Sequence, residues 1–203
     1  MPPNPPVTSP AIRVQSQLTP VMLNHAAWVT PDAEITADFY TRIMGMEIGS
    51  TVFDIHAPAG GEQIPFFHIF FRMKDGSTLA FFEAPGLPPR PHPSHPAYHI
   101  FDHIALQAES RDEVIEWKGW LESNGVAVFG PTDHNGLIFS IYFDDPVGIR
   151  LEITAPLDPH WNRHTEVGKV DLQQWVTTKK KAQMEGGDVR AALANLVRER
   201  HKR

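Results

Sequence analysis

A repeated order of secondary-structure signals constrains the fold of this chain more than any other feature. Stretches rich in apolar and β-branched residues predict four strands in the first half, at 23–29, 46–53, 64–73 and 78–83. A second series predicts four more strands, at 100–106, 126–129, 137–143 and 149–154. Apolar residues at helical spacing follow the first strand of each series, over 33–44 and 110–124. The sequence therefore predicts a β-α-β-β-β module that occurs twice, in an α+β fold.

Proline-rich segments mark the boundaries of the two modules. The chain contains 19 prolines, and residues 1–19 combine several of them with no periodicity, which predicts a disordered arm. The prolines within 85–97 exclude an inner strand or a regular helix and predict a linker. Module one is accordingly predicted over 20–84 and module two over 98–155. Residues 156–203 are predicted to form a loop and C-terminal helices.

Composition and charge exclude several function classes. The net charge of −6 argues against broad binding to nucleic acids or anionic membranes. The absence of cysteine excludes disulfides and thiolate metal sites, and is compatible with a reducing compartment. No apolar run is long enough to span a bilayer, and the first residues lack the pattern of a secretory signal. The sequence predicts a cytoplasmic protein with neither a nucleic-acid nor a membrane partner.

The segment 132–152 carries the clearest candidate site residues. Two predicted strands flank the turn sequence Asp145-Pro146-Val147-Gly148. The second strand alternates between apolar and polar residues, which places Glu152 on its polar face. A hairpin of this kind holds His134, Tyr142 and Glu152 near one another. An imidazole, a phenol and a carboxylate beside one sheet face predict a functional site; an ordinary polar surface is the alternative.

A histidine and a glutamate recur in both modules. His25 lies in the first predicted strand of module one, and Glu83 lies in the fourth. His103 and Glu152 take the corresponding places in module two. Pseudo-twofold packing of the modules would bring these four side chains to one centre. Imidazoles and carboxylates without thiolates suit Fe(II), Mn(II), Ni(II), Co(II) or Zn(II), so the sequence predicts a metal site. Surface or internally satisfied side chains are the alternative.

The duplicated pattern over about 21–155 resembles the vicinal oxygen chelate superfamily, which includes glyoxalase I, extradiol ring-cleaving dioxygenases, and fosfomycin- and bleomycin-resistance proteins. The resemblance implies two tandem modules that form a mixed sheet cupped around a metal. It implies metal ligands at His25, His103 and Glu152. In glyoxalase-type members a further ligand falls on Glu83.

Within this superfamily, the segment that contains His134, Tyr142, Asp145-Pro146 and Glu152 is most similar to the extradiol dioxygenase signature. The resemblance implies an enzyme that uses Fe(II) and dioxygen to cleave a catecholic aromatic ring. It implies that His134 polarises substrate and dioxygen. It also implies that Tyr142 hydrogen-bonds the bound catecholate.

One position departs from the extradiol pattern. Enzymes of that class carry another active-site histidine, a proposed acid–base residue, in the fourth strand. The corresponding position in this chain is Ser77. Another histidine, such as His68 or His99, is then required to supply that function.

The role of Glu83 separates two reaction classes. With His25, His103 and Glu152 as the only protein ligands, three positions of an octahedral metal stay open, enough for a catecholate and dioxygen. With Glu83 bound as well, two positions remain, which suits a glyoxalase- or epimerase-like lyase or isomerase with the metal as Lewis acid. A third hypothesis, a metal-free small-molecule binding or resistance protein, needs no ligand set.

Two further expectations concern the pocket and the C-terminus. Aromatic side chains are expected to line a pocket for a substrate ring, with core packing as the alternative for each: Trp28, Phe66, Phe70, Phe81 and Phe101. Asp171 and Asp188 are expected to cap two C-terminal helices, the first reaching about Glu185. Their apolar residues need a surface to cover them, either the body of the protein or a second subunit, so a homodimer is one expectation.

Overall fold

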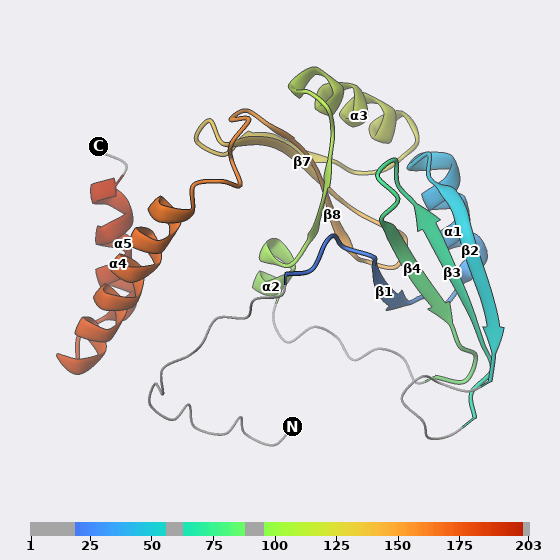
Figure 1. The fold of residues 1–203 in the computed structure, drawn as a ribbon, viewed down its shortest axis with the longest axis horizontal. Helices are drawn as coiled ribbons and strands as arrows, with labels where there is room; N and C mark the ends of the chain where they lie inside the picture. Colours follow the sequence, from blue (N-terminus) through green and yellow to red (C-terminus); the bar gives the residue numbers. More distant parts are fainter. Residues whose placement is uncertain (1–18, 56–62, 88–95, 201–203) are drawn as a thin grey trace. The chain divides into compact units, whose positions relative to one another are not determined.

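A computed structural model describes residues 19–55, 63–87 and 96–200 of the 203-residue chain (Figure 1). The chain divides into two compact units. The first unit comprises Met1–Pro96 together with Asp145–Ile149, and the second comprises Ala97–Asp144 and Arg150–Arg203. The predicted N-terminal arm, apart from Thr19, and the central part of the predicted linker lie outside the described residues.

The first unit contains a mixed four-stranded sheet in the order β1-β4-β3-β2. Its strands are β1 (His25–Val29), β2 (Glu47–Asp54), β3 (Phe66–Arg72) and β4 (Thr78–Glu83). β1 runs parallel to β4, whereas β3 pairs antiparallel with both β2 and β4. The four strands match the number and order that the sequence predicts for module one.

Helix α1 (Ala33–Asp38) and the π-helical turn η1 (Phe39–Ile43) pack on this sheet. The side chain of Asp32 caps the start of α1 by accepting hydrogen bonds from the next turn. Tyr40 of η1 is fully buried, and its ring centroid lies 5.1 Å from that of Phe71 and 5.0 Å from that of Phe81. The predicted helix over 33–44 is therefore present, but its second half widens into a π-turn, with the N–H of Met44 bonded to the carbonyl of Phe39.

The second unit repeats this arrangement with the sheet order β5-β8-β7-β6. Its strands are β5 (Ile104–Gln107), β6 (Phe129–Asp133), β7 (Ile138–Asp144) and β8 (Arg150–Pro156). Helix α3 (Arg111–Ser123) packs on β7 and β8, and its Val114 and Leu121 are fully buried (Figure 1). Ser110 caps this helix as its sequence signature predicts.

Alternation along β8 separates a core face from a polar face. Leu151 and Ile153 are buried on the side of α3, together with Ile141 of β7. Arg150 and Glu152 therefore project from the other side of the sheet. The candidate site residues of this unit belong to that second face.

Two strand predictions in module two are displaced. The strand predicted to start at Ile100 is wrong at its beginning, because Pro96–Phe101 form a short helix, α2, and β5 starts only at Ile104. Proline suits the first turn of a helix because the N–H groups there have no partner within the helix, so its missing N–H costs no hydrogen bond. The strand predicted at 126–129 is found at Phe129–Asp133. Even so, the predicted α+β class with two four-stranded modules and C-terminal helices is confirmed.

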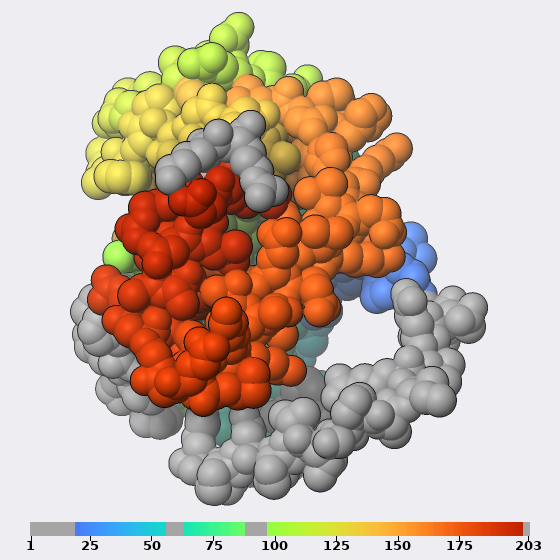
Figure 2. All heavy atoms as spheres, turned by 90° about the vertical axis from the view of Figure 1, so that its left-hand side faces the viewer, coloured from blue at the N-terminus to red at the C-terminus, as the bar shows by residue number. Residues whose placement is uncertain are grey.

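The C-terminal extension is a pair of helices, α4 (Thr165–Met184) and α5 (Val189–Arg200), which lie side by side (Figure 2). The predicted start of the first helix at Asp171 is wrong. Asp171 instead lies within α4, and its carboxylate accepts hydrogen bonds at 2.5 and 2.6 Å from the guanidinium of Arg200 in α5. In the part of the chain that the structure describes, no helix has the length and apolar character needed to cross a membrane.

Candidate metal centre

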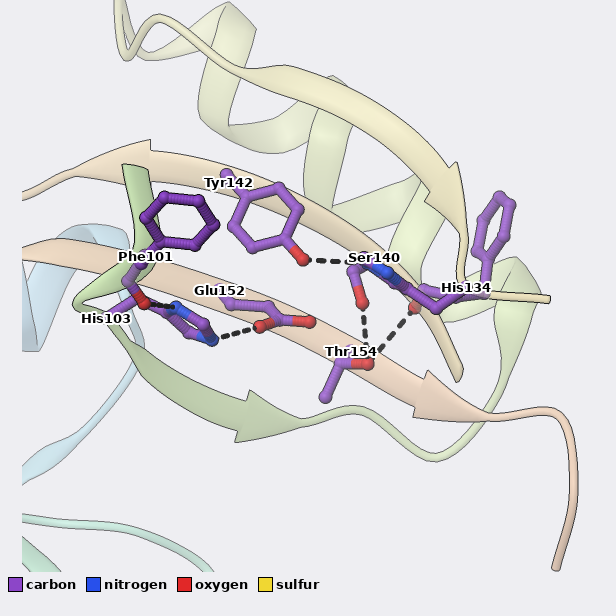
Figure 3. Close-up of polar contacts among 8 residues, drawn as sticks. Phe101, His103, His134, Ser140, Tyr142, Glu152 and Thr154 are labelled. Atoms are coloured by element: carbon purple, nitrogen blue, oxygen red, sulfur yellow. Dashed lines mark hydrogen bonds and ion pairs between the residues drawn. The ribbon is translucent and has the colours of Figure 1, made fainter. Parts of the chain in front are cut away.

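The polar face of the second sheet holds a buried glutamate beside a histidine. Nε2 of His103, just before β5, lies 2.7 Å from Oε2 of Glu152 in β8 (Figure 3). The Glu152 side chain is 3% exposed. Its other oxygen, Oε1, is buried and has no hydrogen-bond partner among the described residues. An unpartnered buried polar atom costs about 1–3 kcal/mol, and more when it is charged, so this carboxylate is poised for a ligand.

Hydrogen bonding fixes the tautomer of His103. Its Nδ1 lies 2.7 Å from the carbonyl oxygen of Phe101, which can only accept, so Nδ1 carries the proton. In the neutral imidazole, Nε2 then turns a lone pair toward a carboxylate oxygen that is also an acceptor. Two acceptors this close repel each other unless a proton or a cation lies between them. A divalent cation would satisfy Nε2 and the Glu152 carboxylate together, so these residues fit a metal.

Tyr142 and His134 lie beside this pair. Tyr142 of β7 pairs directly with Glu152, and its ring lies edge-on to His103 at 5.8 Å between centroids. The Tyr142 hydroxyl lies 2.8 Å from Nε2 of His134, in the turn between β6 and β7. Burial, and after it the charge of Glu152, raises the pKa of Tyr142, so the phenol keeps its proton at neutral pH. The structure thus brings together the four residues predicted in this module.

Arg150 shares the face, although the sequence analysis assigned it no role. Its Cζ lies 4.9 Å from the ring centroid of Tyr142. Its Nε is buried and has no hydrogen-bond partner among the described residues. The period-two alternation of β8 is the sequence signal that could have found it, because that alternation places Arg150 on the same face as Glu152.

The first unit has its own histidine-bearing face. His25 begins β1, and its Nδ1 lies 2.7 Å from Oδ1 of Asn24, an acceptor, so Nδ1 carries the proton and Nε2 keeps the lone pair that a metal needs. The ring of His68 in β3 lies 6.3 Å from that of His25 and stacks on Phe82 at 3.6 Å between centroids. His68 is buried, and its Nε2 has no partner in the described ranges. Burial, and then the proximity of His25, lowers the pKa of His68.

The predicted correspondence between Glu83 and Glu152 is wrong. Glu152 is the strand partner of the residue two places after His103. The residue two places after His25 pairs instead with Ala80. Glu83 lies three residues beyond Ala80, an odd number, so it projects from the opposite face of β4. The histidine–carboxylate pair of the second unit therefore has no counterpart at the equivalent positions of the first.

Glu83 instead forms a hydrogen bond at the start of α1. Its Oε2 accepts a 2.7 Å hydrogen bond from the backbone N–H of Ala33, the first residue of α1. His25 pairs with Thr78, five residues from Glu83, which is about 17 Å along the strand. Within the first unit, the structure therefore does not bring His25 and Glu83 together.

The five aromatic residues predicted to line a pocket do not share one face. Phe81 is fully buried, and its ring lies 6.0 Å from that of the half-buried Trp28, so both lie on the side of the sheet that η1 covers. Phe66 and Phe70 lie on the opposite face of the sheet, the one that carries the histidines. Phe101 ends α2 and is 75% exposed. Phe66 and Phe70 are the two that stay candidates beside the first-unit histidines.

Ser77, at the position where a further histidine was expected, serves a turn. Its N–H and its hydroxyl both donate to Oδ1 of Asp75, at 3.0 and 2.6 Å. His99 of α2 lies 3.0 Å from Oδ1 of Asp144, and both side chains are exposed. Of the two histidines suggested as substitutes, His68 is the one that lies on the same sheet face as a predicted metal ligand, His25.

Neither unit alone, across its described residues, gathers three or more metal-binding side chains. The second unit contributes two, His103 and Glu152. The predicted ligand set draws on both modules, so neither unit is expected to complete it by itself.

Comparison with known proteins tests these expectations. A family model described as the Glyoxalase/Bleomycin resistance protein/Dioxygenase superfamily matches residues 22–153. A Bacillus subtilis (strain 168) protein named "Putative ring-cleaving dioxygenase MhqA" is 25% identical over 136 residues, which are 66% of this chain and 40% of that protein. The chain thus spans less than half the length of this relative.

A solved structure shares the fold. A glyoxalase/dioxygenase from Nostoc punctiforme superimposes with a TM-score of 0.50 at 24% identity, over 71% of this chain and 99% of that one. A lactoylglutathione lyase from Agrobacterium tumefaciens gives a TM-score of 0.46 at 21% identity, over 68% and 96% of the two chains. The family match includes at least part of each of the eight strands, and it confirms the resemblance seen in the sequence. The chain therefore belongs to the Glyoxalase/Bleomycin resistance protein/Dioxygenase superfamily.

Proposed function

We propose that the protein is a metal-dependent ring-cleaving dioxygenase of the extradiol type, which uses Fe(II) to open a catecholic ring beside its two hydroxyl groups. The observation that carries this proposal is the grouping of His103, Glu152, Tyr142 and His134 on one face of the second sheet. The name of the Bacillus subtilis relative supports ring cleavage. The same donor set also suits Mn(II), Ni(II), Co(II) or Zn(II).

The side chains of this face have separate tasks in the proposed reaction. His103 and Glu152 would hold the metal, and the family resemblance gives His25 as a third ligand. When bound, ferrous iron supplies the electron transfer that lets dioxygen react with a catecholate. Tyr142 keeps its proton and is placed to donate a hydrogen bond to a substrate oxygen. His134 lies 2.8 Å from that hydroxyl, so with its proton on Nε2 it would donate to the phenol oxygen and leave the Tyr142 proton for the substrate.

The position of Glu83 favours a dioxygenase over a glyoxalase-like lyase or isomerase. A fourth protein ligand would leave too few metal positions for a catecholate and dioxygen together. Glu83 points to the helix side of its sheet and accepts a hydrogen bond from Ala33. The proposed ligand set is therefore limited to three protein residues.

Replacing Glu83 with glutamine is expected to leave metal content unchanged. The substitution weakens the cap on α1, so the free energy of unfolding should fall by about 1 kcal/mol. Metal analysis of the purified variant, together with urea denaturation, measures both effects. Loss of stoichiometric metal from Glu83→Gln would restore the lyase or isomerase hypothesis.

Anaerobic loading with Fe(II), followed by oxygen-uptake assays on a panel of catechols, tests the proposed function. At least one catechol is expected to be consumed with one dioxygen per ring, with both atoms of labelled dioxygen found in the ring-opened product. No uptake with any catechol by protein that holds stoichiometric iron would contradict the proposal. Protein that binds no metal after careful purification and reloading would instead support a metal-free binding protein.

The cytoplasmic location and the homodimer that the sequence analysis predicts stay predictions.

A further inference from the structure

The guanidinium of Arg150 carries a hydrogen-bond donor that no described residue satisfies. Its Nε is buried and has no hydrogen-bond partner among the described residues. A guanidinium has five N–H donors and no acceptor, and burying one of these N–H groups without a hydrogen-bond partner costs free energy. Its Cζ lies 4.9 Å from the Tyr142 ring centroid, which holds the cation over the same face as the candidate metal ligands.

The carboxylates beside Arg150 do not supply the missing hydrogen bond to its Nε. Asp144 lies opposite Arg150 in the strand ladder, but its Oδ1 is 3.0 Å from Nε2 of His99. Glu152 lies on the same face, yet its free oxygen, Oε1, also has no partner in the described part of the chain. Two opposite charges on one face thus each keep an unsatisfied atom. This pattern favours a ligand that carries both a metal-binding group and an anion.

The spacing defines the size of such a ligand. Arg150 precedes Glu152 by two residues in β8, which is about 6.6 Å along the strand. That separation is close to the length of one aromatic ring with substituents at opposite sides. Tyr142 pairs with Glu152 and contacts the guanidinium of Arg150, so it lies beside both charged residues.

We propose that Arg150 binds a carboxylate substituent on the aromatic substrate, so that the preferred substrates are dihydroxy aromatic acids. The inference rests on the proposed function and narrows its substrate class. The guanidinium fork matches a carboxylate through two parallel hydrogen bonds, which a neutral substituent cannot reproduce. The catechol oxygens of the same molecule then face the His103–Glu152 pair.

A binding experiment without turnover tests this assignment. Protein loaded with redox-inert Zn(II) is titrated with 3,4-dihydroxybenzoate and with 3,4-dihydroxybenzamide, its neutral counterpart of similar shape. The acid is expected to bind at least about tenfold more tightly to the unmodified protein. Arg150→Gln should weaken binding of the acid by about 10- to 100-fold and binding of the amide by less than about threefold. Arg150→Lys, which keeps the charge but loses the fork, should retain part of the preference.

Arg111→Gln is the matched control. The Arg111 guanidinium also lies over an aromatic ring, at 4.5 Å from the Phe139 centroid, but on the side of the sheet covered by α3. This variant should leave both affinities unchanged. Equal binding of acid and amide to the unmodified protein would overturn the inference. So would an equal loss of both ligands, or loss of zinc, in Arg150→Gln and Arg150→Lys, because Arg150 would then only support Glu152.

The titration separates this inference from the proposed function. It involves neither oxygen nor iron, so a preference for the acid that depends on Arg150 supports the assignment even if no catechol is cleaved. An active dioxygenase that shows no such preference would keep the proposed function and discard the role of Arg150.

Discussion

Replacing Glu152 with glutamine is expected to abolish metal binding and leave the fold intact. The carboxylate is buried, has one oxygen without a partner in the described residues, and faces the lone pair of His103 across 2.7 Å. Glutamine has nearly the same shape and removes the buried charge, and its amide can donate to Nε2 of His103. The free energy of unfolding of the metal-free protein should therefore stay the same or rise by about 1 kcal/mol.

Activity and metal content should fall together in this variant. Loss of groups that only support metal ligands already costs about 10- to 100-fold in affinity or activity, so loss of a ligand should cost at least a hundredfold. Metal analysis, oxygen uptake and urea denaturation of Glu152→Gln measure the three quantities. His103→Ala is expected to lose metal as well. Glu166→Gln, at an exposed glutamate of α4 paired with Lys169, is the control and should keep full metal content. Stoichiometric metal in both site variants would refute the proposed centre.

Tyr40→Phe is expected to cause the largest loss of stability among the single substitutions considered. The Tyr40 hydroxyl donates a 2.8 Å hydrogen bond to Oδ2 of Asp145, and both residues are buried. The other oxygen of Asp145 accepts from the backbone N–H groups of Val147 and Ile149, which closes the turn between β7 and β8. Removing the hydroxyl leaves a buried carboxylate oxygen without this donor, so the free energy of unfolding should fall by about 2–3 kcal/mol.

The same bond predicts a dependence of stability on alkaline pH. Burial, followed by the charge of Asp145 and the hydrogen bond to it, raises the pKa of Tyr40 well above its usual value. In the unfolded chain a tyrosine ionises near pH 10, so above that pH the unfolded state releases a proton that the folded state keeps. This contribution to stability is complete below about pH 10 and is lost at about 1.4 kcal/mol per pH unit above it.

Urea denaturation between pH 8 and pH 11 would check both expectations for Tyr40. Tyr40→Phe should be destabilised at pH 8, and above about pH 10 the slope of its stability should be smaller by one proton than that of the unmodified protein. Tyr98→Phe is the control, because Tyr98 is 57% exposed in α2, and it should change stability by less than about 0.5 kcal/mol. A change of the same small size in Tyr40→Phe would show that the buried bond contributes little.

Local sequence patterns were sufficient to predict the two modules and the position of two candidate site residues, Tyr142 and Glu152. Alternation along β8 and the turn chemistry at Asp145 place Tyr142 and Glu152 on adjacent strands, and the structure pairs them directly. Short-range signals also locate the caps at Asp32 and Ser110. These features depend on residues close together in the chain, which is why they can be read from it.

The register between paired strands could not be predicted from local sequence patterns. Glu83 and Glu152 each lie in the last strand of a module, but only Glu152 stands beside a histidine, because the ladder between β1 and β4 pairs His25 with Thr78. A shift of three residues moves a side chain both along the strand and to the other face. Nothing within a single strand reports its alignment with another strand that lies about fifty residues away in the chain.

The sequence by itself determined the doubled β-α-β-β-β order, the superfamily, and the histidine and glutamate that meet in the second unit. Only the tertiary structure decided that Glu83 accepts a hydrogen bond from the start of α1 and that Tyr40 donates to Asp145 in the turn between β7 and β8. It also decided that Arg150 lies beside Tyr142 with its Nε unbonded among the described residues. The physical reason is that periodicity fixes which face a side chain takes within its own element. The partners of a side chain, its burial and any polar atom left without a hydrogen bond depend on how distant elements pair and pack.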